Sequence, residues 1–166
     1  MLSFFKNNKE TKVECLANQI IAPAKGKMID VTTVGDKMFA EKMMGETVAF
    51  DFDGDEVTIC APATGTLSAL FPTGHAFGIT MENNTEIMLH IGVNTVSTKG
   101  DGFTILNKHQ GDKVKAGEPI VKVDFKKLRK SYETSTMLIV INPAGHNVSF
   151  VARQSVELGS VIGQAD

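Results

Sequence analysis

The chain has 166 residues, of which 42% are hydrophobic and 22% charged, a composition typical of a globular domain with a buried core. Its formal net charge of −2 argues against nucleic-acid binding, and no apolar run approaches the roughly 20 residues that a membrane span needs. Cys15 and Cys60 form no C-x-x-C pair, which favours reduced thiols and predicts a cytoplasmic location.

Residues 1–17 are predicted to form a flexible N-terminal tail, and residues 18–166 a single domain. The apolar residues of Met1–Phe5 are interrupted by Lys6 and by Asn7–Lys9, so the start is too short for a signal sequence. Apolar residues followed by lysines would also allow contact with a membrane surface, but a disordered start is the favoured interpretation.

The domain is predicted to be all-β with little helix. Short apolar or alternating runs recur at the spacing of about 8 to 12 residues that is typical of sandwiches and barrels. These runs cover residues 28–31, 57–60, 65–70, 76–81, 87–91, 120–123, 137–141 and 148–150. Residues 82–85 fit a hairpin tip, and only residues 125–130 look helical. Since each strand buries one face, the pattern favours a sandwich or a partly closed barrel.

Two segments suggest an internal repeat. Ala22–Met28 (A-P-A-K-G-K-M) recurs as Ala61–Leu67 (A-P-A-T-G-T-L), and Gly35–Met38 has a parallel in Gly111–Val114. Each A-P-x-x-G unit needs proline for one bend and glycine for the next. We therefore expect a structural repeat of two strand–turn units that pack on each other, although A-P-x-x-G is also a common turn sequence.

Two histidines lie in apolar sequence, where a solvated histidine is unusual. His75 occurs in T-G-H-A-F, and His90 occurs within the strand-like run I-M-L-H-I-G. Paired imidazoles beside apolar surface suit phosphoryl relay, metal binding or proton transfer.

Several segments together resemble the IIA component, glucose family, of the bacterial phosphoenolpyruvate-dependent sugar phosphotransferase system. The resemblance spans roughly residues 18–165, and the sequence around His90 is its most specific part. The matching segments are F-A-E-K at 39–42, A-P-A-T-G at 61–65, H-A-F at 75–77, H-I-G-V-N-T-V at 90–96, K-G-D-G-F at 99–103 and G-D-K-V-K-A-G at 111–117. The resemblance implies an antiparallel β-sandwich, which agrees with the strand pattern.

The resemblance implies that the protein is a phosphoryl carrier and a phosphotransferase component. His90 would accept phosphate from the phosphohistidine of HPr and give it to a cysteine of a IIB domain of a sugar permease. His75 would be the auxiliary histidine, and the Thr73 hydroxyl would fix the tautomer of His75. Backbone N–H groups near Gly92 could add hydrogen bonds to the phosphate. Metabolic or transport proteins regulated by the phosphorylation state are further candidate partners, and a monomer is expected.

The same resemblance implies an apolar docking patch around the histidines, to which five residues are assigned: Phe39, Phe71, Phe77, Met88 and Val96. Asp36 corresponds to an acidic residue at the rim of that patch. The family usually has an acid where this chain has Asn94, a departure that would alter partner choice.

Two other classes of protein share parts of this sequence pattern. A biotinyl or lipoyl carrier domain shares the A-P-x-x-G strands, and Lys42 before Met43–Met44 mimics the modified lysine, but the order of motifs is wrong. A lysostaphin-like zinc peptidase needs H-x-x-x-D and H-x-H, which His75 and His90 do not provide. No resident cofactor is therefore expected, and the two histidines predict at most a weak zinc site shared with a partner.

Overall fold

The computed structural model describes residues 13–166. Its elements, in chain order, are β1 (Gln19–Ile21), β2 (Gly26–Ile29), η1 (Val31–Thr33), α1 (Lys37–Ala40), β3 (Thr47–Phe52), β4 (Glu56–Cys60), β5 (Gly65–Leu70), β6 (Ala76–Met81), β7 (Glu86–Ile91), η2 (Thr95–Thr98), β8 (Phe103–Ile105), β9 (Lys113–Val114), β10 (Pro119–Asp124), α2 (Phe125–Leu128), β11 (Thr136–Asn142), β12 (Val148–Phe150), β13 (Ser155–Val156) and β14 (Val161–Ala165). None of the helices in this part of the chain has the length and apolar character needed to cross a bilayer.

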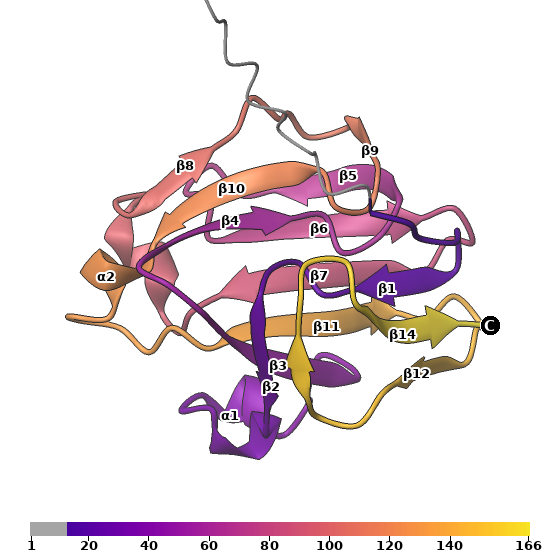
Figure 1. Cartoon of the computed structure of the whole chain (residues 1–166), viewed down its shortest axis with the longest axis horizontal. Helices are drawn as coiled ribbons and strands as arrows, with labels where there is room; N and C mark the ends of the chain where they lie inside the picture. The colour runs from indigo at the N-terminus through magenta and orange to yellow at the C-terminus, as the bar shows by residue number, and fades with distance from the viewer. Residues whose placement is uncertain (1–12) are drawn as a thin grey trace, which may run out of the picture.

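The strands form three antiparallel sheets, which confirms the predicted all-β, antiparallel sandwich. The largest has eight strands in the order β13-β2-β3-β11-β7-β6-β5-β9, and two three-stranded sheets have the orders β4-β10-β8 and β1-β14-β12. Figure 1 shows α1 at the lower edge of the molecule and β1, β12 and β14 near the C-terminus.

One face of the eight-stranded sheet packs against the two smaller sheets. Its β6 and β7 contribute Phe77, Ile79 and Leu89 to a core cluster that also contains Ile59 of β4 and Val121 of β10. These side chains are at most 1% exposed. Alternation along each strand therefore leaves the intervening residues of β6 and β7 on the opposite, outer face.

A second, smaller cluster covers part of that outer face. It consists of buried residues from β3, β11, the loop after β7 and the η1–α1 segment: Val31, Val34, Phe39, Ala49, Val93, Met137 and Ile139. The η1–α1 segment thus packs on the outer face of the sheet, beside the strand that carries His90.

The A-P-x-x-G segments form a pseudo-symmetric pair, as predicted. The Ile21 N–H donates to the Pro62 carbonyl at 2.8 Å, and the Cys60 N–H donates to the Pro23 carbonyl at 2.9 Å. The glycine of each segment then opens a strand, β2 or β5, and pairs with the short strand β13 or β9.

These two glycines lie against a neighbouring strand too closely for any side chain. A Cβ atom at Gly26 would lie 2.3 Å from the Asp51 carbonyl oxygen, and one at Gly65 would lie 2.1 Å from that of Thr80. The second pair of repeated segments is not structurally alike. Gly35–Met38 leads into a helix, whereas Gly111–Val114 leads into strand β9.

Some local features differ from, or lie partly outside, the sequence-based expectations. Helix α1 and the strands β1, β3, β8, β9, β13 and β14 fall outside the predicted runs. Of these, β3 pairs with both β2 and β11 in the main sheet. Residues 1–12 of the predicted tail lie outside the described residues. Within residues 13–17, the Leu16 N–H donates to Gln19 Oε1 at 3.0 Å. The predicted hairpin tip and the short helix α2 are present.

Candidate functional site

His90 lies on the outer face of the eight-stranded sheet. In β7, Leu89 and Ile91 belong to the core and are buried, so alternation directs His90 away from them. Across the sheet, His90 pairs in register with Ala76 of β6 and with Met137 of β11. The imidazole, beside the small side chain of Ala76, is half-buried.

His75 lies next to His90, as expected. The ring centroids are 5.1 Å apart and the rings are nearly perpendicular, at 81°. The turn before β6 places His75 there: Gly74 has φ +77°, a backbone conformation that favours glycine. His75 is only 4% exposed, so a partner can approach His90 more directly than His75.

The backbone fixes the tautomer of neutral His90. The His90 Nδ1 atom lies 2.8 Å from the Gly92 carbonyl oxygen. Because a carbonyl only accepts hydrogen bonds, Nδ1 carries the proton and donates it, and Nε2 is left with a free lone pair. Neutral His90 therefore presents its nucleophilic nitrogen away from the backbone.

Gly92 turns the chain sharply after His90, with φ +76°. A Cβ atom there would lie 2.5 Å from Thr95 Cγ2. The Gly92 N–H itself is not available to a ligand, because it donates to the Ser135 carbonyl at 3.0 Å. The next N–H, of Val93, donates to the Glu133 carbonyl at 2.9 Å.

The Thr73 hydroxyl and His75 Nδ1 are hydrogen-bonded in a short contact. The edge of the His75 ring also meets the Phe71 ring, with centroids 5.3 Å apart. The structure therefore brings together Thr73, His75 and His90, the three residues predicted to act in catalysis.

Both imidazoles are biased toward the neutral state. Burial, followed by the proximity of His90, lowers the pKa of His75 from 6.5 to about 4. Burial also lowers the pKa of His90, while the hydrogen bond to Gly92 and the Asp36 carboxylate partly oppose that shift. At pH 7 the pair is neutral, which is the form in which an imidazole nitrogen is a nucleophile.

Exposed apolar side chains occur on the segments around the histidines. Phe71 is 40% exposed and Val96 is 55% exposed, while Met88 is half-buried beside His90 on the same face of β7. Met38 of α1, which no local sequence pattern indicates, is 45% exposed. We call Met38, Phe71, Met88 and Val96 the apolar rim.

Two residues assigned to the docking patch lie elsewhere. Phe77 pairs with Leu89 on the inner face and is 1% exposed, so its assignment to a docking surface is wrong. Phe39 is 5% exposed, and its ring lies 4.9 Å from the His90 ring. It supports His90 from the protein side rather than presenting an open surface.

The two polar residues assigned to the rim have different local roles. Asp36 is half-buried and caps α1, with its Oδ1 accepting the Met38 N–H at 2.9 Å. Asn94 is exposed and has a left-handed backbone, with φ 59° and ψ 18°. Asparagine tolerates that conformation better than most residues, which is a local reason for its presence there.

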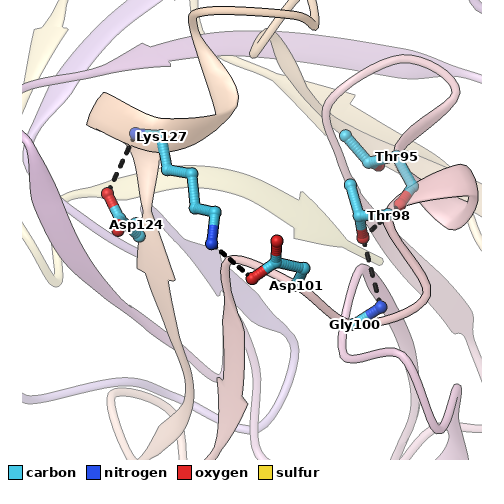
Figure 2. A network of polar contacts seen from close by, with 6 residues as sticks. All are labelled: Thr95, Thr98, Gly100, Asp101, Asp124 and Lys127. Carbon is cyan, nitrogen blue, oxygen red and sulfur yellow. Dashed lines mark hydrogen bonds and ion pairs between the residues drawn. The ribbon is translucent and has the colours of Figure 1, made fainter.

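A polar network secures the segment that carries Val96. Figure 2 shows it: Thr98 Oγ1 donates to the Thr95 carbonyl at 2.8 Å and accepts the Gly100 N–H at 3.2 Å. Next along the chain, Asp101 accepts from Lys127 Nζ at 2.5 Å, and the Lys127 N–H donates to Asp124. The loop after His90 is thereby tied to α2.

The described residues hold no complete metal site. Within residues 13–166 no group of three or more His, Cys, Asp or Glu residues could hold a metal ion. His75 and His90 would supply at most two of the four ligands that zinc usually takes. A zinc ion shared with a partner stays a prediction.

Cys60, Lys42 and the other two histidines lie outside the site. Cys60 is 3% exposed in the core, and burial raises the pKa of its thiol to about 11. Lys42, the residue that mimics a biotinyl lysine, pairs with Glu46 at 2.6 Å. His109 is exposed, and His146 Nε2 lies 2.9 Å from the Asn83 carbonyl oxygen in a loop.

Comparison with known families places this geometry in context. Residues 18–146 match the family described as phosphoenolpyruvate-dependent sugar phosphotransferase system, EIIA 1. A glucose-specific EIIA component from Halalkalibacterium halodurans is 36% identical over 140 residues, which cover 82% of this chain and 79% of that protein.

A solved structure supports the same relationship. Glucose permease IIA from Mycoplasma capricolum has a TM-score of 0.80 and 35% identity, covering 87% of this chain and 93% of that one. A glucose-specific EIICBA component from Staphylococcus carnosus is 35% identical over 144 residues, which are 86% of this chain. This chain spans only 21% of that longer protein.

Proposed function

Because this chain belongs to the EIIA 1 family of the phosphoenolpyruvate-dependent sugar phosphotransferase system, and so has a phosphocarrier role in sugar uptake, we propose that His90 is its phosphorylated residue. His90 accepts the phosphoryl group from the phosphohistidine of HPr and passes it to a cysteine of a IIB domain. One observation carries this assignment: Nδ1 of His90 is bound to the Gly92 carbonyl, so Nε2 is free in a half-buried ring beside a second imidazole.

The transfer conserves atoms and charge. The lone pair of His90 Nε2 attacks phosphorus, the N–P bond of phospho-HPr breaks, and the HPr histidine leaves as a neutral imidazole after taking up a proton from solvent. In the second step a cysteine thiolate of the IIB domain attacks phosphorus and the N–P bond to His90 breaks. Catalysis of such transfers depends mainly on positioning and on groups that stabilise the equatorial oxygens.

His75 supplies one such stabilising group. The Thr73 hydroxyl is hydrogen-bonded to His75 Nδ1. With the hydroxyl as the donor, the neutral ring carries its proton on Nε2 and can donate it to a phosphoryl oxygen. The low pKa of His75 keeps the ring neutral rather than cationic, so its role is that of a hydrogen-bond donor and not of a positive charge.

The apolar rim is the proposed docking surface for HPr and for the IIB domain. Apolar side chains around a polar centre suit the core of an interface, and a flexible methionine such as Met88 adapts to different partners. Asp36 would face basic groups of a partner, and Asn94 removes one charge from that side of the surface. Cytoplasmic location, a monomeric state and additional regulated partners stay predictions.

Replacing Phe71 by Ser should weaken docking while leaving the fold intact, because the ring is 40% exposed and already meets solvent. We expect the KM for phospho-HPr to rise by about tenfold, the effect of losing one interface residue worth about 1.4 kcal/mol. Steady-state phosphate transfer from phospho-HPr measures it. Val161→Ser, at 42% exposure on β14, is the matched control and should leave KM unchanged. An unchanged KM for Phe71→Ser would remove Phe71 from the docking surface.

The proposed function is tested by incubating the protein with phosphoenolpyruvate, enzyme I and HPr. Mass spectrometry under alkaline conditions, which preserve an acid-labile phosphohistidine, should find one phosphoryl group on the peptide that contains His90. Addition of a IIB domain should then remove it. Phosphate on another residue, or none at all, would refute the assignment.

A further inference from the structure

Glu133 contacts both chain segments that surround His90. Its carboxylate accepts the Gly35 N–H, with nitrogen–oxygen distances of 3.0 and 3.2 Å, and its backbone carbonyl accepts the Val93 N–H at 2.9 Å. Gly35 and Glu133 are 98 positions apart in the sequence. One residue in the loop before β11 therefore joins the start of the α1 segment to the turn that follows His90.

The Gly35 side of this bridge leads directly to the His90 ring. The next residue, Asp36, caps α1, and α1 carries Phe39, whose ring lies 4.9 Å from the His90 ring at 48°. Val34 and Phe39 pack into the outer cluster, but Gly35 between them is exposed. The Glu133 side chain supplies the acceptor oxygen for this exposed N–H.

The other side of the bridge leads to the atom that fixes the His90 tautomer. Val93 follows Gly92, whose carbonyl accepts from His90 Nδ1. The Ser135 carbonyl holds the Gly92 N–H, and the Ser135 hydroxyl donates to the Glu133 carboxylate at 3.3 Å. Loss of the Glu133 carboxylate leaves these backbone bonds in place, so it releases the α1 side and the Ser135 hydroxyl but not the turn after His90.

We propose that Glu133 is a positioning residue for His90: its carboxylate holds the Gly35 N–H and thereby keeps Phe39 against the His90 ring. The catalytic part of this inference rests on the proposed function, whereas the structural part does not. With the carboxylate removed, the α1 segment becomes freer to move and His90 loses a support that fixes its orientation toward an incoming phosphate.

Gly35 offers a reciprocal way to break the same contact. A Cβ atom at Gly35 would lie 2.6 Å from Glu133 Oε2, and its only other neighbour within 4 Å is the carboxyl carbon of the same side chain. Gly35 is not among the residues with positive φ, so alanine fits its backbone. Gly35→Ala therefore displaces the Glu133 carboxylate and meets no other atom.

The structural part is tested by NMR, using the ring-proton shifts of His90 as a report on the nearby Phe39 ring. Phe39→Leu defines the full loss of the ring current. We expect Glu133→Ala and Gly35→Ala to move the His90 shifts in the direction set by Phe39→Leu. Glu133→Gln, which keeps an acceptor oxygen, and Glu82→Ala, an exposed acid at the β6–β7 tip, should leave them as in the unmodified protein. Unmoved shifts in both Glu133→Ala and Gly35→Ala would overturn the proposal.

The catalytic part is tested by separating kcat from KM for transfer from phospho-HPr. We expect Glu133→Ala and Gly35→Ala each to lower kcat by about tenfold. This is less than the roughly hundredfold loss that a displacement of about 1 Å can cause. KM should change by less than about twofold. Their combination should lose no more than either alone, since both delete one contact. Glu133→Gln should restore kcat.

Two kinetic results would overturn the positioning role. A higher KM for Glu133→Ala with unchanged kcat would mean that Glu133 contacts the partner directly. If Glu133→Gln behaves like Glu133→Ala, the transfer depends on the negative charge of Glu133 and not on its hydrogen bond. If the unmodified protein takes up no phosphate, the proposed function fails, while the NMR comparison still decides whether Glu133 holds the α1 segment.

Discussion

The His90→Ala variant is expected to take up no phosphate from phospho-HPr, a loss of at least about 10⁴-fold, the scale seen when a nucleophile is removed. Nε2 of His90 is the nitrogen that the backbone leaves free, because Nδ1 is bound to the Gly92 carbonyl. His75 cannot replace it, since that ring is 4% exposed and its Nδ1 is bound to Thr73. Incubation with the phosphate donors followed by alkaline mass spectrometry measures the loss.

The fold should survive this substitution. His90 is half-buried on the outer face and does not belong to either buried core cluster, so its truncation removes no side chain from the core. His109→Ala is the matched control, because His109 is an exposed loop histidine whose ring lies 3.8 Å from the Asp112 carboxylate. Phosphate uptake by His90→Ala at a rate close to that of His109→Ala would contradict the assignment.

The two histidines could be found from the sequence because each depends on local context. His90 lies in a strand whose neighbours, Leu89 and Ile91, are apolar, and period-two alternation puts it opposite the core. The same alternation, applied across the β6–β7 pair, places Phe77 opposite Leu89 and inside the core. The expected surface position of Phe77 is wrong because the face that a residue occupies depends on the register between the two strands.

The missed features depend on contacts between distant parts of the chain. Met38 becomes exposed beside the site only because the four-residue helix α1 packs on the outer face of the sheet, and so short a helix has almost no periodic signal. Glu133 reads as an ordinary charged loop residue until β11 brings it to Gly35. No local pattern indicates a contact over 98 positions, so neither residue could be assigned from the sequence.

The His75→Ala variant is expected to accept phosphate on His90 but to pass it to a IIB domain about 100-fold more slowly. The nucleophile and its tautomer are untouched, because His90 Nδ1 stays bound to Gly92. What is lost is one hydrogen bond to the phosphoryl oxygens, and removing one such donor typically costs about 3 kcal/mol in the transition state. Rapid-quench measurement of phosphate leaving His90 gives the rate.

A second variant separates the tautomer of His75 from the presence of its ring. Thr73→Val keeps the shape of the side chain but removes the hydroxyl that is hydrogen-bonded to Nδ1. His75 can then place its proton on either nitrogen, and only one tautomer donates toward His90. The rate of onward transfer should therefore fall between those of the unmodified protein and His75→Ala. The His75 ring centroid lies 5.1 Å from that of His90. If His75→Ala nevertheless passes phosphate onward at the rate of the unmodified protein, the second imidazole takes no part in the chemistry.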